Sequence, residues 1–586
     1  MTVSKLFGLS LLLLALVLLV SACQSPGSST AVPTPVPQPK QVKGTFIDGE
    51  SGGDAETLNF ILAGDASSFS YAGQTMDGLG GYDNHFNIVL RLLAKDIETS
   101  ADGLVYTITI RDDLYWTGKV KVTAADFVYT LKNLMFSDWL DYTYKSDWQE
   151  NVDGKSVFVE AKVVSDTTFT ITRQTVYPEF IYSLYSLTPY PKHIASKYEG
   201  DVKAFTQADE FNNLSYTGNL GPYIYEDWVR NDKFVVARNP DYYLGKDAGA
   251  PYFEKYEVKL FGTPATRQAA LEAGDITSTG IEPQNVARFK RMPNINVYTT
   301  PTTGYSLMLF NMRDNGWAGL KDKKVRQAIN MSISKDLLIQ SVLEGFAEPA
   351  FSFIPSSSPW YSDEGLQKYG VGPLYDKTRG AQALSEAGYG VTKSGNKVEA
   401  RDKDGKPLKL SLFTSTGSSV SESMALLVKQ ELGAIGIEVD VKLVPWPTLL
   451  GKYVRNKVPG SAQEPQFNNG KAAVSEEQWD LIIMALNTNP IAPSGSDVFY
   501  VANGGLNFSG YFNPKVDELF QRARSAEALG KEQRKQIYQQ LAGLLSEEQP
   551  VEFFAYHQAN SGFMKTVQGI EPGINMGYNY YLWYFQ

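Results

Sequence analysis

Cysteine and histidine are scarce in this sequence: its 586 residues include one cysteine, Cys23, and three histidines. A single cysteine excludes a disulfide within the chain, so packing must stabilise the fold. The histidines, His85, His193 and His557, have no second histidine at the spacing of metal ligands. We therefore expect each to be a surface or hydrogen-bonded core residue. The sequence predicts neither a metal site nor a cofactor.

Positive charge is also limited, because 54 lysines and arginines are outnumbered by 64 aspartates and glutamates, which leaves a net charge of −10. Binding to a nucleic-acid backbone depends on clustered basic side chains, and the sequence has no such cluster. We expect no nucleic-acid partner.

The sequence has no H-E-x-x-H motif, no phosphate-binding loop and no dinucleotide fingerprint. Residues 49–53, Gly-Glu-Ser-Gly-Gly, formally fit the G-x-S-x-G nucleophile elbow. We expect no strand before them and no helix after them, so the sequence does not predict an enzyme. The 64 acidic residues could supply the carboxylate pair of a glycosidase, and composition alone leaves that class open.

The one long apolar run lies at the N-terminus, over residues 6–20, between Lys5 and a group of small residues. This is the pattern of a bacterial export signal. The run is short for a membrane span, and a retained N-terminal anchor is the alternative. We expect residues 1–22 to be a lipoprotein signal peptide.

The tetrapeptide Val-Ser-Ala-Cys that ends at Cys23 looks like a lipobox. In a lipobox, cleavage before the cysteine lets its thiol carry diacylglycerol, and acyl chains contribute about 0.8 kcal/mol of membrane affinity per buried methylene. Residues 24–42 contain five prolines and no apolar periodicity, which predicts an extended tether over 23–42. The globular part should then be held off the membrane while attached to it.

The stretch 103–132, GLVYTITIRDDLYWTGKVKVTAADFVYTLK, predicts a strand followed by a helix. Tyr106 and alternate residues around it form the apolar face of a half-buried strand. Thr123 is the expected helix N-cap, and Asp126 lies in the first turn, where a carboxylate favours the helix dipole. Phe127 and the leucines after it continue at helical spacing.

The second half of the chain predicts a βαβαβ unit with parallel strands and right-handed crossovers. Its strands are expected at 408–412, 437–443 and 481–486, the last buried on both faces, with helices at about 421–434 and 447–456. Two amphipathic helices should follow, and aromatic-rich strands are expected at 551–557 and 578–585. The apolar faces of these helices carry Val516, Leu519, Phe520 and Ala523, and Ile537, Leu541 and Leu544.

Three of the longer stretches match a known family. Residues 217–243, TGNLGPYIYEDWVRNDKFVVARNPDYY, match its signature at Gly221, Pro222, Tyr223, Trp228, Arg238, Asn239, Pro240, Asp241 and Tyr242. Residues 103–132 and 507–520, NFSGYFNPKVDELF, carry further matches. On these residues the chain resembles the family 5 extracellular solute-binding proteins, the peptide- and nickel-binding receptors of ABC importers, over nearly all of 57–575.

The resemblance implies an α/β, periplasmic-binding-protein-like fold of two lobes with parallel sheets, built from interleaved chain segments, and an extra domain. We expect lobe I at 43–80 with 190–305 and 550–586, the extra domain II at 81–189, and lobe III at 306–549.

The implied protein is a lipid-anchored monomer on the outer face of the bacterial cytoplasmic membrane, or in the periplasm. It would capture an oligopeptide-like solute between its lobes and deliver it to an ABC permease with ATPase subunits. An oligosaccharide receptor of the same fold and a surface peptide sensor without a transport role remain alternatives.

The expected ligand site lies at the end of the last strand of the βαβαβ unit, because ligands bind beyond the carboxyl ends of parallel strands. There Leu486, Asn487 and Asn489 would face a cleft. In the oligopeptide receptors an aspartate at the position of Asn489 pairs with the amino terminus of the peptide, so the resemblance implies that this charge is missing here. Asp497 is the nearest substitute, and a solvated loop carboxylate is its alternative role.

Aromatic residues complete the expected site. Trp446 follows a strand and could stack on a ligand, as could Trp360 and Trp116, although tryptophans lie more often in cores. Phe60 stands where the family places a Leu-Asp-Pro turn beside its ligand. We therefore predict a cleft with aromatic walls.

Overall fold

The computed structural model describes residues 40–586 apart from residues 52, 396 and 463. The predicted signal segment, Cys23 and almost all of the tether lie outside these residues. In the described part of the chain, no helix combines the length and the apolar character that crossing a membrane requires.

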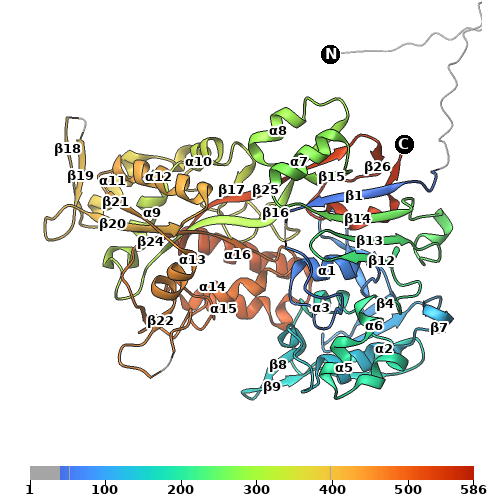
Figure 1. The fold of residues 1–586 in the computed structure, drawn as a ribbon. Coiled ribbons are helices and arrows are strands. Elements are labelled where there is room, and N and C mark those ends of the chain that lie inside the picture. Colours follow the sequence, from blue (N-terminus) through green and yellow to red (C-terminus); the bar gives the residue numbers. More distant parts are fainter. Residues whose placement is uncertain (1–39, 52, 396, 463) are drawn as a thin grey trace, which may run out of the picture. The chain divides into compact units, whose positions relative to one another are not determined.

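Among the described residues, eleven strands form one mixed sheet (Figure 1). Parallel pairs lie in both halves of it: β1 pairs with β14 and β15, and β20 pairs with β21 and β24. The long antiparallel strands β16 and β25 join the two ends. The order is β12 (Tyr223–Val229), β13 (Lys233–Arg238), β14 (Lys255–Leu260), β1 (Thr45–Glu50), β15 (Ser278–Gly280), β25 (Val551–Met564), β16 (Ile295–Phe310), β24 (Leu481–Asn487), β20 (Lys409–Ser415) and β21 (Glu438–Val444), with β17 (Ala347–Pro349) paired to β25.

Buried apolar side chains of the described residues form two large cores. The first core gathers residues between Phe46 and Val258 together with Phe563, Val567 and Trp583. The second core gathers residues between Tyr305 and Tyr556. Strands β16 and β25 therefore run from one core to the other, and they are the covalent connection between the two halves.

The first core also covers a four-stranded antiparallel sheet, which contains the predicted strand of the 103–132 stretch. That strand is β5 (Val105–Ile110), and Tyr106, Ile108 and Ile110 are buried as predicted. The predicted helix is α2 (Ala124–Tyr129), and Thr123 and Asp126 form a capping box at its start. The sheet order is β10 (Glu160–Val163), β11 (Thr168–Thr172), β5 and β4 (Ala94–Thr99).

Short elements complete this half. Its helices are α1 (Ala66–Gly73), α3 (Phe180–Tyr185), α4 (Lys192–Ala195), α5 (Val202–Gln207), α6 (Asp209–Asn212), α7 (Pro264–Ala273) and α8 (Pro283–Phe289). Its two-stranded ribbons are β2 (Gly80–Tyr82) with β3 (Ile88–Arg91), β6 (Tyr115–Trp116) with β7 (Val120–Lys121), β8 (Gln149–Val152) with β9 (Lys155–Phe158), and β26 (Val567–Gln568) with β27 (Tyr584–Phe585).

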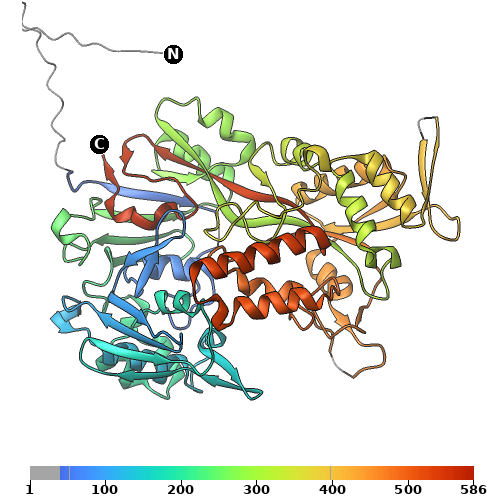
Figure 2. The same ribbon diagram turned by 180° about the vertical axis from the view of Figure 1, so that it is seen from behind.

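In the second core the predicted βαβαβ unit is confirmed. The helix α12 (Ser419–Gly433) joins β20 to β21, and the first four residues of β24 are buried. The amphipathic helices α15 (Pro514–Ala523) and α16 (Lys531–Glu548) pack side by side (Figure 2). The other elements are α9 (Lys323–Ser332), α10 (Lys335–Val342), α11 (Lys377–Glu386), α13 (Trp446–Thr448), α14 (Asp497–Tyr500), β18 (Gly390–Ser394) with β19 (Lys397–Arg401), and β22 (Asn456–Lys457) with β23 (Val474–Ser475).

The predicted strand at 578–585 is wrong for most of its length. Met576–Leu582 is a 3-10 helix, and only Tyr584–Phe585 is a strand. Successive tyrosines explain the difference: the Tyr580 ring lies 5.8 Å from that of Tyr256, and the Tyr581 ring lies 5.3 Å from that of Tyr242. A strand would direct neighbouring side chains to opposite faces, whereas both rings pack on the first core.

Candidate functional site

The two cores meet through a buried carboxylate. Glu179, which precedes α3 on the side of the first core, is 1% exposed. Its oxygens accept hydrogen bonds from the Ser494 hydroxyl, in the loop after β24, and from the Tyr538 hydroxyl of α16. Burial raises the pKa of Glu179. This contact fixes the chain before α3 against two elements of the second core.

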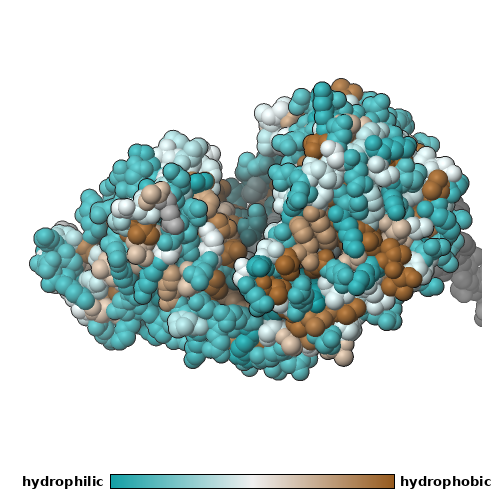
Figure 3. All heavy atoms as spheres, turned by 90° about the horizontal axis from the view of Figure 1, so that it is seen from below, coloured by the Kyte–Doolittle hydropathy of each residue, from teal (hydrophilic) through white to brown (hydrophobic). Residues whose placement is uncertain are grey.

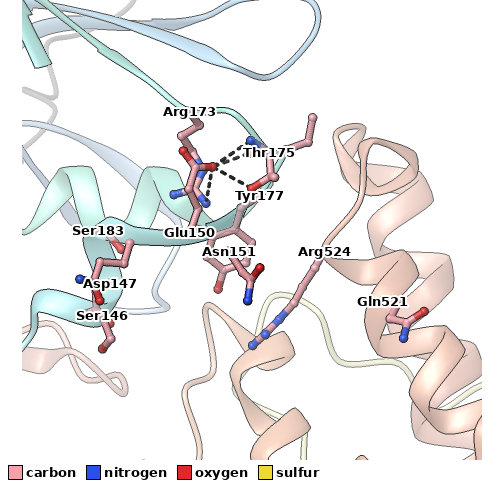
Figure 4. A pocket seen from close by; sticks show the side chains of 12 residues that line it. Ser146, Asp147, Glu150, Asn151, Arg173, Thr175, Tyr177, Ser183, Gln521 and Arg524 are labelled. Atoms are coloured by element: carbon pink, nitrogen blue, oxygen red, sulfur yellow. Dashed lines mark hydrogen bonds and ion pairs between the residues drawn. The ribbon is translucent and has the colours of Figure 1, made fainter. Parts of the chain in front are cut away.

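Beside Glu179 lies a cavity of about 720 Å³, hereafter the boundary cavity. Figure 4 shows Arg524 extending from the end of α15 into the space between that helix and the segment that carries Tyr177. Of the twelve residues that line the boundary cavity, ten come from the first half of the chain, and Gln521 and Arg524 come from α15 and its end. The twelve lining residues are Ser146, Asp147, Gln149, Glu150, Asn151, Arg173, Thr175, Val176, Tyr177, Ser183, Gln521 and Arg524.

A buried ion pair forms one wall of the boundary cavity. Arg173 Nη2 lies 3.5 Å from Glu150 Oε2, and both side chains are at most 4% exposed. Glu150 also accepts hydrogen bonds of 2.8 Å from the backbone amides of Gln174 and Thr175. Burial lowers the pKa of Arg173, and its Nη1 has no hydrogen-bond partner among the described residues. This wall therefore holds a buried donor without a partner in the described part of the chain.

The opposite wall carries a second ion pair, between Arg524 and Asp497. Arg524 Nη1 lies 2.7 Å from Asp497 Oδ2, and Arg524 Nη2 donates to the Ser494 carbonyl at 3.0 Å. The Arg524 guanidinium carbon lies 5.7 Å from the ring centroid of Tyr177, across the boundary. Asp497 is thus held by an arginine and does not offer a free carboxylate in this arrangement. Its expected role as an anchor for an amine stays a prediction.

The expected polar residues lie at the end of β24. Leu486 pairs with Tyr305 of β16, and the exposed Asn487 pairs with Gly304. A Cβ added to Gly304 would lie 3.2 Å from His557 Nδ1, so the close approach that glycine permits here is to His557. The Asn489 side chain accepts hydrogen bonds of 3.1 Å from the amides of Ile491 and Ala492, so it stabilises its own loop. Both Asn487 and Asn489 are exposed.

The expected aromatic residues differ in exposure. Trp446 is 46% exposed at the start of α13, and Phe60 is half-buried with its ring 5.2 Å from that of Phe69. Trp360 is 6% exposed, and its indole N–H donates to the Ile491 carbonyl, so it supports the loop after β24. Trp116 is fully buried, and the idea that it stacks on a ligand is wrong. Figure 3 shows the surface hollowed between two masses, with hydrophobic residues on both sides of the hollow.

Four residues of this region were not predicted from the sequence: Glu150, Arg173, Glu179 and Arg524. No local pattern marks them, because each gains its role from segments far away in the chain: Glu179 and Ser494 are 315 positions apart. The expectation that no strand precedes residues 49–53 is wrong, because β1 runs up to Glu50. The next helix begins only at Ala66, so the segment still lacks the strand–turn–helix context of a nucleophile elbow.

Comparison with known proteins places this geometry in a family. The family model for bacterial extracellular solute-binding proteins, family 5 Middle, matches residues 89–507. The chain belongs to the family 5 solute-binding proteins. Its fold is accordingly the two-lobed α/β fold that the resemblance implied.

Relatives of this family 5 member include the oligopeptide-binding protein AppA of Bacillus subtilis, 25% identical over 95% of this chain and 94% of the relative. The dipeptide-binding protein of Lactococcus lactis is 26% identical over 79% of this chain and 87% of that protein. Among solved structures, the substrate-binding protein CtaP of Listeria monocytogenes gives a TM-score of 0.74 at 22% identity, covering 93% of this chain and 100% of CtaP.

Proposed function

We propose that this protein captures an oligopeptide-like solute between its two cores and delivers it to an ABC permease. The observation that carries the proposal is the boundary cavity, because residues from both halves of the molecule line it. The chain also belongs to a family of solute-binding proteins, which supports a role for this cavity in solute binding. Amide side chains such as Gln149, Asn151 and Gln521 both donate and accept hydrogen bonds, as the backbone of an extended peptide requires. The names of AppA and the dipeptide-binding protein support this solute class.

Capture requires the two cores to move relative to each other, and β16 and β25 are the connection that would bend. Their pairing register is interrupted between Pro301 and Tyr305. The Ser306 hydroxyl and His557 Nε2, 2.6 Å apart, hold the two strands together just beyond this point. Binding would favour the closed population in proportion to its higher affinity for solute. The protein would bind and release its solute without covalent chemistry.

The interleaved segments also support the expected division into lobe I, domain II and lobe III, and the lipobox supports anchoring through Cys23. In this proposal the receptor is tethered to the outer face of the cytoplasmic membrane by residues 23–42. An oligosaccharide receptor is the second candidate, favoured by the exposed ring of Trp446, which follows β21 at the start of α13.

Calorimetry and small-angle scattering test the proposal together. A pentapeptide, a nonapeptide and maltopentaose are titrated into the protein, and the radius of gyration is measured with and without saturating ligand. We expect peptide binding, a smaller radius with peptide, and at least tenfold weaker binding in Arg524→Gln. Lys515→Gln, an exposed change on the same helix, is the matched control and should bind normally. Binding of maltopentaose alone, or an unchanged radius at verified saturation, would contradict the proposal.

A further inference from the structure

A second cavity lies between β1, α1 and the last turns of the chain. Its volume is about 510 Å³, and an adjoining hollow of about 210 Å³ shares Asp48, Glu50 and Tyr256 with it. Of the described residues that line these two spaces, none falls between positions 281 and 560. The second cavity is therefore built by the first half of the molecule alone, apart from the boundary cavity.

Two carboxylates face this second cavity. Asp48 and Glu50 are two residues apart on β1, so both side chains lie on the same face of the strand. Asp48 accepts hydrogen bonds from the Ser278 hydroxyl at 2.5 Å and the Tyr256 hydroxyl at 3.4 Å. Among the described residues no hydroxyl group donates to Glu50, and its nearest cation is an Arg267 nitrogen 4.0 Å away.

Arg267 does not neutralise the site. Its guanidinium lies 4.0 Å from Glu50 and 3.7 Å from Glu282, and the second cavity also contains Asp48. One arginine is thus shared by three carboxylates. When all of these groups are ionised, the second cavity carries a net negative charge.

Seven aromatic residues also line these two spaces, and two of their rings stack. The Phe46 and Tyr256 rings lie 5.0 Å apart, and Trp583 lies 5.8 Å from Phe46. Faces of aromatic rings attract cations. The Tyr71 hydroxyl lines the adjoining hollow without a hydrogen-bond partner among the described residues, although Tyr71 is 2% exposed. The aromatic lining residues are Phe46, Phe69, Tyr71, Tyr256, Phe563, Tyr580 and Trp583.

We propose that the second cavity binds a small organic cation through a primary ammonium group. The ammonium group would donate to Glu50 and Asp48 and to the unsatisfied Tyr71 hydroxyl, while its alkyl part packs on the aromatic rings. A bare metal ion fits less well, because it needs several oxygen ligands and the described residues contain no group of three acidic, histidine or cysteine side chains that could hold one. This proposal does not depend on the proposed peptide function.

Protonation of the site follows from the same geometry. Burial, with the nearby charge of Asp48, raises the pKa of Glu50 to about 7, and burial raises the pKa of Asp48. The other ionisable groups that face Glu50 are Tyr71 on α1, Tyr256 on β14 and Arg267 on α7. A cation favours the ionised carboxylate, so its binding releases a proton. Affinity should rise about tenfold from pH 6 to pH 8 if Glu50 titrates near 7.

Calorimetry with n-butylammonium, and with n-butanol and butyrate as its neutral and anionic analogues, tests the proposal on the full chain. We expect the amine alone to bind, at one site and more tightly at pH 8. Glu50→Gln should weaken it at least tenfold, and Tyr71→Phe, which removes one oxygen, about threefold. The matched control is Glu257→Gln, because Glu257 neighbours Tyr256 on β14 and points to the opposite face of the sheet.

Several results would overturn the proposal. The first is binding of n-butanol as tight as that of n-butylammonium, and the second is no binding of the amine at 10 mM. The third is an equal loss of amine affinity in Glu257→Gln and Glu50→Gln. Weakening by Asp497→Asn but not by Glu50→Gln would place the amine in the boundary cavity and would also refute the assignment. Circular dichroism establishes that each variant is folded, and Glu50 is 50% exposed, so its substitution leaves the core intact.

Discussion

Lys335 and Glu552 form an ion pair inside the second core, and its removal gives a quantitative test of the structure. Lys335 Nζ lies 3.1 Å from Glu552 Oε1, and the two side chains are 1% and 0% exposed. The ammonium group also donates to the Ala350 carbonyl at 2.7 Å. Burial raises the pKa of Glu552 to about 7 and lowers that of Lys335. In Lys335→Met the carboxyl group would lose the cation that offsets its burial.

The expected loss is large and depends on pH. Removing one partner of a buried pair costs about 3–5 kcal/mol, because the other charge is left uncompensated. Without Lys335, the pKa of Glu552 in the folded state rises further, and the group folds protonated. An acid with a raised folded-state pKa contributes most stability below its unfolded value of 4.5. That contribution falls by about 1.4 kcal/mol per pH unit as pH rises toward the folded-state pKa.

Guanidinium unfolding at pH 5.5 and pH 7.5, followed by tryptophan fluorescence, measures both effects. The free energy of unfolding of Lys335→Met should fall by about 2–3 kcal/mol from pH 5.5 to pH 7.5, whereas that of the wild type, with a Glu552 pKa of about 7, should fall by about 2 kcal/mol. Adding Glu552→Gln should recover most of the loss and remove the pH dependence. The control is Lys409→Met, whose solvent-exposed pair with Glu438 should leave the stability nearly unchanged. A loss below about 1 kcal/mol in Lys335→Met at both pH values would refute the reasoning.

Three further predictions concern the receptor itself. Cys23→Ser should abolish lipidation and move the protein into the aqueous phase on detergent partitioning, whereas unchanged membrane retention would identify the apolar segment as the anchor. N-acetylation of a bound peptide should change its affinity less than tenfold, because Asn489 carries no charge and Asp497 is paired with Arg524; a hundredfold loss in calorimetry would contradict this. Trp446→Ala should weaken ligand binding about 2- to 12-fold, because a ring contact with the ligand is lost. The control is Leu426→Ala, an exposed apolar change on α12, which should have no effect. Equal affinities of the two variants would count against a role for the indole.

Elements with a local apolar period could be predicted from the sequence. The alternation in β5 and the helical spacing of Val516, Leu519, Phe520 and Ala523 in α15 both appear as expected, because each is set by burial of one face. The segment 578–585 has no such period: aromatic residues occupy nearly every position, and only the packing of each tyrosine decides the backbone.

The site could be predicted only where it follows strand topology. Asn487 ends β24 and Asn489 follows it, as expected from the strand pattern, whereas their role in a ligand site stays a prediction. The contacts of Glu179 depend on Ser494 and on Tyr538, 359 positions away, and no spacing in the sequence encodes such a meeting. The hydrogen bond from the Trp360 indole to the Ile491 carbonyl likewise joins residues 131 positions apart, so the sequence gives no local sign of it.

The first core combines residues from the beginning and the end of the described chain, and this affects the order in which the protein folds. The Phe46 ring lies 5.8 Å from that of Trp583, and Lys43 Nζ donates to the carbonyl of the last residue, Gln586. Contacts between residues this far apart form slowly, because a long loop must close first. A chain that is synthesised or exported N-terminus first cannot complete the first core until residues 563–583 have emerged. Removal of residues 577–586 should therefore leave the first core incomplete, because Trp583 no longer packs against Phe46.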